Sequence, residues 1–236
     1  MKKGYIKILL VLLFCFTGVA QADILAGKIA LEAMKGTDEI RVSEGRFIVF
    51  EPVQGTKTGL VFYPGAKVDP LAYAPLALRL TKKRIMTIIV PMPNNLAIFG
   101  MNRADIVLTT YPDIENWFMA GHSHGGSVAG NYLFNNADRF RGFILLASFS
   151  GRDLSDKCLP VLSIAASEDG IITLDAVRNK THLLPKTVEQ VIIEGGNHAQ
   201  FGDYGWQNGD MEAKISMEVQ LNWTVEEMVK FIGNNE

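Results

Sequence analysis

Short apolar runs alternate with amphipathic segments along most of this chain. Runs rich in Val, Ile, Leu and Phe are typical of buried strands, and apolar positions three and four residues apart indicate helices. The pattern predicts strands at residues 39–42, 46–50, 59–63, 86–90, 117–121, 140–148, 161–166 and 188–193. It predicts helices at residues 23–34, 70–82, 97–110, 124–135, 174–184 and 224–232.

Strands that alternate with helices predict βαβ units, and hence an α/β fold with a mostly parallel central sheet and helices on both faces. The first two strands are expected to form an opening hairpin. Asp69 is expected to cap the helix at 70–82, and Thr224 is expected to cap the last helix. Ligands of such sheets bind beyond the carboxyl ends of the strands, so a functional site is expected in the loops that follow them.

The first residues of the chain follow a different pattern. Lysines precede an apolar stretch at 8–16, and an A-x-A cleavage signal ends at Ala22. The apolar stretch is shorter than the about 20 residues of a bilayer-spanning helix. We therefore expect residues 1–22 to be a secretory signal peptide and residues 23–236 to form a single domain. An uncleaved N-terminal membrane anchor is the alternative.

The length, net charge and cysteine content of the chain bear on its fold and on its partners. The 236 residues are enough for one domain with a substantial core, and a formal net charge of −2 gives no reason to expect a nucleic-acid partner. Cys158 is the one cysteine after the leader, so the domain is expected to fold without an internal disulfide. Cys158 itself is expected to be a small buried apolar residue.

Residues 121–125 read Gly-His-Ser-His-Gly and stand between a predicted strand and a predicted helix. This order is typical of a nucleophile elbow, a tight turn that lifts a serine hydroxyl above the edge of the sheet. The flanking positions of such a turn must lack bulky side chains, and Gly121 and Gly125 meet that need. The pattern predicts Ser123 as a catalytic nucleophile.

A serine hydroxyl needs a general base. His122 and His124 flank Ser123 inside the elbow, so their side chains are expected to point away from its hydroxyl. His182 falls within a predicted helix. His198 follows a strand through a glycine-containing loop, which makes it the best candidate for the base.

The base needs an acid to orient it, and in this fold the acid falls between the serine and the histidine in the chain. Asp169 follows the strand at 161–166 directly and is the first candidate. Glu168, one residue away, is its rival.

The oxyanion of an acyl-transfer reaction needs two backbone N–H donors. We expect one from His124, the residue after the nucleophile. The other is expected from the loop after the strand at 59–63, with Ala66 as the first candidate and Lys67 as the second.

Several segments together resemble the α/β-hydrolase superfamily, and specifically its compact "family 5" branch, which is similar to dienelactone hydrolases. The segments are FYPGAKV at 62–68, AYAP at 72–75, GHSHGG at 121–126, SEDG at 167–170 and GGNHAQFGDYG at 195–205. The resemblance covers roughly residues 46–232 and implies a Ser–Asp–His triad on Ser123, Asp169 and His198. Dienelactone hydrolases carry a cysteine nucleophile, and Ser123 argues against their chemistry.

These observations predict an exported serine hydrolase, a carboxylesterase that acts on small-molecule esters through an acyl-enzyme. The connection at 149–160 is too short for a lid domain, so the site is expected to be open to water. No cofactor, metal or nucleic acid is expected, and membrane contact is expected only if the N-terminal segment is uncleaved. The alternatives are a non-catalytic binding protein on a hydrolase scaffold and a zinc hydrolase that uses His122 and His124, although catalytic zinc usually has three protein ligands.

Overall fold

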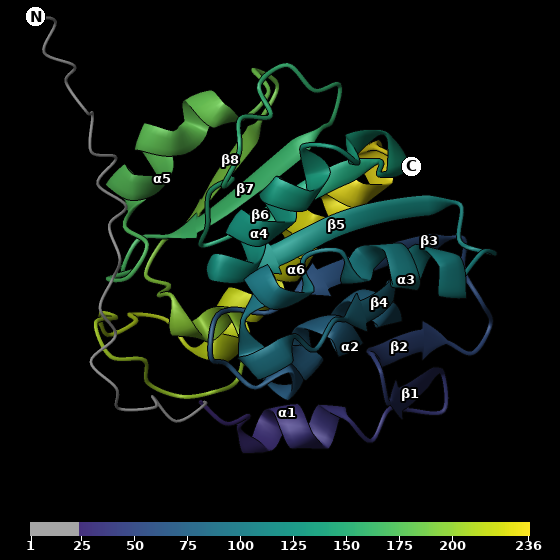
Figure 1. Cartoon of the computed structure of the whole chain (residues 1–236). Coiled ribbons are helices and arrows are strands. Elements are labelled where there is room, and N and C mark those ends of the chain that lie inside the picture. Colours follow the sequence, from purple (N-terminus) through teal and green to yellow (C-terminus); the bar gives the residue numbers. More distant parts are fainter. Residues whose placement is uncertain (1–23) are drawn as a thin grey trace, which may run out of the picture.

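The computed structural model describes residues 24–236, so the expected signal peptide at 1–22 lies outside the described residues. Across the described residues the strands form one eight-stranded sheet in the order β1-β2-β4-β3-β5-β6-β7-β8 (Figure 1). The strands are β1 (Ile40–Glu44), β2 (Ile48–Pro52), β3 (Thr58–Tyr63), β4 (Met86–Ile89), β5 (Asn116–His122), β6 (Gly142–Leu146), β7 (Val161–Ala166) and β8 (Glu189–Ile193).

The sheet is parallel apart from one edge. β1 pairs antiparallel with β2, as the predicted hairpin requires, and β2 pairs antiparallel with β4. From β4 to β8 every pairing is parallel. The strand order reverses at β3, which has β4 on one side and β5 on the other. Such a reversal opens a crevice at the carboxyl ends of the strands, where ligands of α/β sheets bind.

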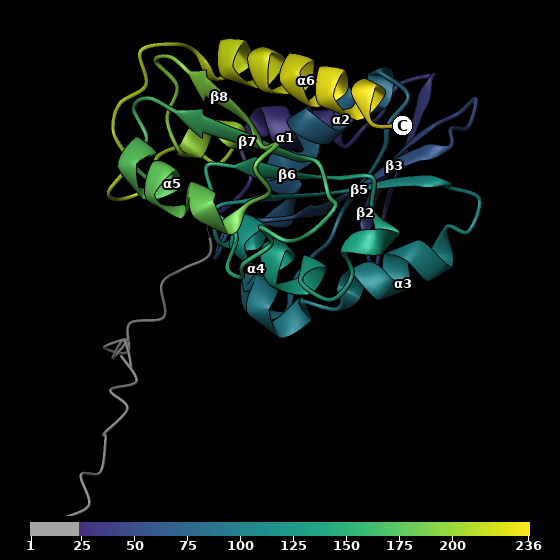
Figure 2. The ribbon, with the colours of Figure 1, turned by 90° about the horizontal axis from the view of Figure 1, so that it is seen from above.

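Helices cover both faces of the sheet, as the alternating pattern predicts (Figure 2). α1 (Lys28–Ala33), α2 (Ala74–Lys82) and α6 (Met217–Asn234) contribute apolar side chains to the core on one face. α3 (Arg103–Thr110) and α4 (His124–Leu133) do the same on the other face, and α5 (Leu174–Lys180) packs beside β7. All six residues of β3 are buried, as expected for a strand covered on both faces.

Several predicted helices are interrupted or shorter. Residues 70–82 begin with a 3₁₀ turn, Pro70–Tyr73, and continue as α2; Asp69 caps the turn by accepting a hydrogen bond from the Leu71 amide at 3.0 Å. Residues 97–110 divide in the same way into a 3₁₀ turn and a helix, whereas residues 174–184 form a helix followed by a 3₁₀ turn. The first helix covers only Lys28–Ala33 of the predicted 23–34.

The predicted start of the last helix is wrong. α6 begins at Met217, and the Ser216 hydroxyl caps it by accepting a hydrogen bond from the Val219 amide. Thr224 is a buried residue inside the helix, where its hydroxyl donates to the carbonyl of Gln220 at 2.8 Å. A threonine can satisfy its hydroxyl in this way within a helix, so it does not have to mark an N-terminus.

Two other features concern the surface. Cys158 is exposed, so the prediction of a buried cysteine is wrong. The segment between β6 and β7 forms no lid in the described structure. Within residues 24–236 no helix has the combination of length and apolar character needed to cross a membrane.

Candidate active site

The turn between β5 and α4 has the strained geometry of an elbow. Ser123 has φ 52° and ψ −127°, a conformation that residues with a β-carbon rarely adopt. Its backbone groups are nevertheless satisfied. The amide donates to the Leu146 carbonyl at 3.0 Å, and the carbonyl accepts from the Ser148 hydroxyl at 2.6 Å and the Ser127 amide at 3.2 Å. These bonds to the end of β6 and to the first turn of α4 hold the serine in its strained conformation.

The two glycines of the motif are required by close packing. A β-carbon on Gly121 would lie 2.5 Å from the amide nitrogen of Gly126. One on Gly125 would lie 2.2 Å from the carbonyl oxygen of Tyr63, at the end of β3. Both contacts are with backbone atoms, which cannot rotate away as a side chain can. The elbow therefore tolerates no side chain at either position.

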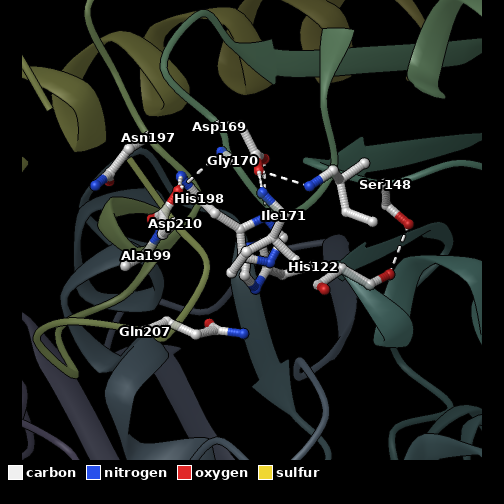
Figure 3. A network of polar contacts seen from close by, with 12 residues as sticks. His122, Ser148, Asp169, Gly170, Ile171, Asn197, His198, Ala199, Gln207 and Asp210 are labelled. Atoms are coloured by element: carbon white, nitrogen blue, oxygen red, sulfur yellow. Dashed lines mark hydrogen bonds and ion pairs between the residues drawn. The ribbon is translucent and has the colours of Figure 1, made fainter. Parts of the chain in front are cut away.

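His198 and Asp169 meet as a buried pair. The Nδ1 atom of His198 lies 2.8 Å from Oδ2 of Asp169, and neither side chain has exposed surface. The other oxygen of Asp169 accepts hydrogen bonds from the amides of Ile171 and Ile172 at 2.8 and 2.7 Å (Figure 3). An ionised carboxylate only accepts hydrogen bonds, so a neutral His198 ring that donates to Asp169 carries its proton on Nδ1 and its lone pair on Nε2. Within the described structure this buried Nε2 atom has no hydrogen-bond partner.

Glu168, the rival acid, is directed elsewhere. Its Oε1 atom lies 2.8 Å from the ammonium of Lys214 and 3.1 Å from the hydroxyl of Ser167. The bond with Lys214 lowers the pKa of Glu168. Of the two adjacent carboxylates, Asp169 is the one that contacts His198.

His122 lies on the same side of the sheet as His198, and the centroids of the two rings are 4.5 Å apart. Its side chain is fully buried, and burial lowers its pKa well below the ordinary value. The Nδ1 atom is 2.8 Å from the hydroxyl of Tyr73, which accepts a hydrogen bond from the Gly65 amide at 3.0 Å. His122 thus connects the elbow, through Tyr73, to the loop after β3.

Tyr73 is a site residue that no local feature of the sequence indicates. It lies inside the AYAP segment, and only the fold brings its hydroxyl to Gly65 and His122. Phe201, which also packs against His122, and Tyr204 are buried near the same rings.

The two candidates for the second oxyanion donor differ in their amide contacts. The amide of Lys67 donates to the carbonyl of Asn95 at 2.8 Å, so it is already engaged. The amides of Ala66 and His124 donate to no other residue in the part of the chain that the structure describes. This arrangement favours Ala66 over Lys67.

The expectation of a site open to water does not hold for its base and acid, which are buried, whereas Ser123 is half-buried. A cleft of about 370 Å³ lies beside the His198 loop, where Ala199, Gln200 and the exposed Trp206 contribute to its lining. Among residues 24–236, no three His, Cys, Asp or Glu side chains are grouped closely enough to hold a metal ion.

Comparison with protein families agrees with this architecture. The model of the alpha/beta hydrolase family matches residues 59–222, which include the elbow and the His198 loop. The chain belongs to this family. No curated protein matches the chain in sequence.

Several solved structures share the fold of this alpha/beta hydrolase. Est1E from Butyrivibrio proteoclasticus, with ferulic acid bound, is 13% identical with a TM-score of 0.61, covering 83% of this chain and 97% of its own. A predicted CIB-like hydrolase from Thermoplasma acidophilum is 12% identical with a TM-score of 0.59, covering 81% and 98%. TT1662 from Thermus thermophilus is 13% identical with a TM-score of 0.60, covering 82% and 98%. At these identities the likeness concerns the fold.

Proposed function

We propose that this protein is a serine hydrolase that cleaves carboxylic esters of small molecules through an acyl-enzyme. The observation that carries the proposal is the buried Asp169–His198 pair. Its 2.8 Å hydrogen bond engages Nδ1 of His198 and leaves Nε2 available to accept a proton. The chain also carries a serine, Ser123, in the strained turn of an elbow. A family match alone would not carry it, because one fold hosts many functions.

In the proposed acylation step, the Oγ atom of Ser123 attacks the ester carbonyl carbon. The Ser123 proton passes to Nε2 of His198, and Asp169 stabilises the imidazolium that forms. The carbonyl oxygen becomes an oxyanion and accepts hydrogen bonds from the amides of Ala66 and His124. When the tetrahedral intermediate collapses, the C–O bond to the alcohol breaks, and His198 returns the proton to the departing alkoxide.

Deacylation repeats these steps with water as the nucleophile. His198 accepts a proton from the water as its oxygen attacks the acyl carbon. The second intermediate collapses when the bond to Ser123 Oγ breaks, and His198 returns the proton to the serine. The products are the carboxylic acid and the alcohol, and the enzyme is regenerated.

We further propose that the enzyme is exported, because residues 1–22 have the features of a secretory signal peptide. Sequencing the N-terminus of the protein recovered from outside the cytoplasm tests this. A chain that starts at Asp23 supports cleavage and export. A chain that retains its first residues in a membrane fraction supports the anchor instead.

Turnover of an ester panel by the purified 23–236 domain tests the proposed reaction. The panel should vary acyl chain and alcohol, and a feruloyl ester belongs in it because Est1E was solved with ferulic acid bound. We expect hydrolysis by the wild type and a loss on the order of 10⁶ in kcat for Ser123→Ala. Hydrolysis by Ser123→Ala at the wild-type rate would overturn the assignment. No turnover of any panel member would favour the non-catalytic binding protein.

A further inference from the structure

A segment without regular structure, residues 202–216, connects the His198 loop to α6. It carries Asp210, which is buried with 6% of its surface exposed. The hydrolytic mechanism gives this carboxylate no task. A buried carboxylate is costly unless it is compensated by hydrogen bonds, so its contacts indicate what it does.

Asp210 accepts hydrogen bonds from four backbone amides. Its Oδ1 atom is 3.1 Å from the amide nitrogen of Gly170, 3.2 Å from that of His198 and 3.0 Å from that of Met211. Its Oδ2 atom is 2.9 Å from the amide nitrogen of Ala199. Figure 3 shows the carboxylate beside the loops that carry Asp169 and His198. No other side chain of the described residues accepts amide bonds from both loops.

Backbone packing brings the same segment against the acid loop. A β-carbon on Gly170 would lie 2.5 Å from the carbonyl oxygen of Gly209 and 3.0 Å from the amide nitrogen of Met211. The absence of a side chain at Gly170 therefore lets the segment approach closely enough for Asp210 to reach the acid loop.

The segment is also tied to the base loop by other bonds. The side-chain amide of Asn197 donates to the Met211 carbonyl at 2.8 Å, and the Lys214 amide donates to the Gly195 carbonyl at 2.7 Å. Gln220 of α6 bonds both the amide and the carbonyl of Asn197. Asp210 thus lies on a segment that hydrogen bonds hold against the base loop.

We infer that Asp210 is the positioning residue of the acid–base pair: its carboxylate sets the separation of the loops that carry Asp169 and His198. Gly170 directly follows the acid, and two of the other three bonded amides belong to the base and its neighbour Ala199. The two loops also bond each other directly, through the Glu168 amide and the Gly196 carbonyl and through the Gly195 amide and the Ser167 hydroxyl. Charge-assisted bonds from amides to a carboxylate are stronger than such neutral bonds, so Asp210 adds the strongest ties beside the acid and the base. This role rests on the proposed function, because the pair it holds is the proposed catalytic pair.

Two variants test the inference. Asp210→Ala removes every bond of the carboxylate. Asp210→Asn keeps the shape and one acceptor oxygen, but it brings an NH₂ group against an amide donor. Asp105→Asn is the matched control, because Asp105 bonds Tyr132 and Arg139 beneath the opposite face of the sheet.

The first readout does not depend on turnover. The proton that His198 shares with Asp169 is expected to give a low-field NMR resonance in the wild type. We expect this resonance to broaden or disappear in both Asp210 variants and to persist in Asp105→Asn. If a folded Asp210→Asn protein keeps the wild-type resonance, the inference is overturned. If the alanine variant does not fold, the asparagine variant decides.

The second readout is the division of the kinetic effect between kcat and KM. We expect kcat to fall about 100-fold in Asp210→Ala and about 10-fold in Asp210→Asn, with KM little changed, because a displacement of about 1 Å in a catalytic group has an effect of this size. Variants that lose stability but keep the wild-type kcat would show a merely structural role and overturn the inference. If the wild type hydrolyses no ester at all, the proposed function fails, while the resonance still reports whether Asp210 holds the pair.

Discussion

At the scale of single residues, the candidate site consists of side chains whose partners come from distant parts of the chain. Ser123, Asp169 and His198 were predictable because each has a local signal, a motif or a strand end followed by a turn. Tyr73 and Asp210 were not, because their contacts join loops that only the folded sheet brings together. A position in sequence does not reveal that a phenol or a carboxylate will accept amide bonds from another loop.

The choice between Asp169 and Glu168 has a kinetic test. Asp169→Asn replaces the carboxylate that orients His198 and allows the wrong tautomer of the ring, so we expect kcat to fall by about 10⁴. Glu168→Gln breaks the contact with Lys214, whose ammonium is exposed, so we expect kcat to change by about twofold at most. A crippled Glu168→Gln enzyme beside an active Asp169→Asn enzyme would exchange the two roles.

The burial of His122 predicts a pH dependence of stability. Its pKa is lowered in the folded protein, so below about pH 6.5 the unfolded chain binds a proton that the folded chain does not. The free energy of unfolding is therefore unaffected by this group above that pH, and falls as the pH decreases below it. For one group the slope reaches at most about 1.4 kcal/mol per pH unit.

Urea unfolding of the wild type and His122→Gln between pH 5 and pH 8 measures this contribution. His124, whose pKa burial also lowers, remains in both proteins, so its own contribution cancels from the difference between the two curves. We expect the two curves of unfolding free energy against pH to run parallel above pH 7. Below pH 6.5 they should converge, because only the wild type loses the stability that comes from the neutral, buried His122. Curves that stay parallel down to pH 5 would show that the pKa of His122 is not lowered in the folded state.

At the scale of elements, the pattern of apolar positions located every strand of the described sheet, with shifts of bounds. The ends of the helices were harder to predict, because several residues near each end have side chains that can cap a helix. Thr224 has a residue type that caps helices, yet its hydroxyl bonds within α6 and Ser216 caps the helix instead. Residues 70–82 divide where Pro75, which has no amide hydrogen, stands in the first turn of α2. Periodicity alone does not report such a break.

Because the elbow packs closely against β3, we expect an alanine substitution at Gly125 to lower stability and activity, and one at Gly233 to lower neither. Gly125→Ala would place its β-carbon 2.2 Å from the Tyr63 carbonyl oxygen, so we expect a less stable protein with a displaced elbow and little activity. Gly233→Ala has no atom within 4 Å of its added carbon and lies in α6, where alanine favours helix by up to about 1 kcal/mol. Thermal unfolding and ester turnover of both variants test this. A stable and fully active Gly125→Ala protein would contradict the geometry of the elbow.

At the scale of the whole molecule, the alternation of strands and helices predicted the parallel sheet, and the family match agrees with it. The strand order was not predictable from periodicity, because the reversal at β3 depends on which face each connecting helix covers. α2 crosses one face between β3 and β4, and α3 crosses the other between β4 and β5. This reversal brings the loop of Ala66 beside the elbow, at the edge of the sheet where the loops of Asp169 and His198 also lie.

The proposed function depends on Ser123 being a nucleophile that His198 activates. A fluorophosphonate probe reacts covalently with such a serine, and mass spectrometry of the digested protein locates the adduct. We expect an adduct on Ser123 in the wild type, none at this position in Ser123→Ala, and labelling slowed by orders of magnitude in His198→Ala. A folded wild-type protein that the probe leaves unmodified, or that carries the adduct on another residue, would contradict the account.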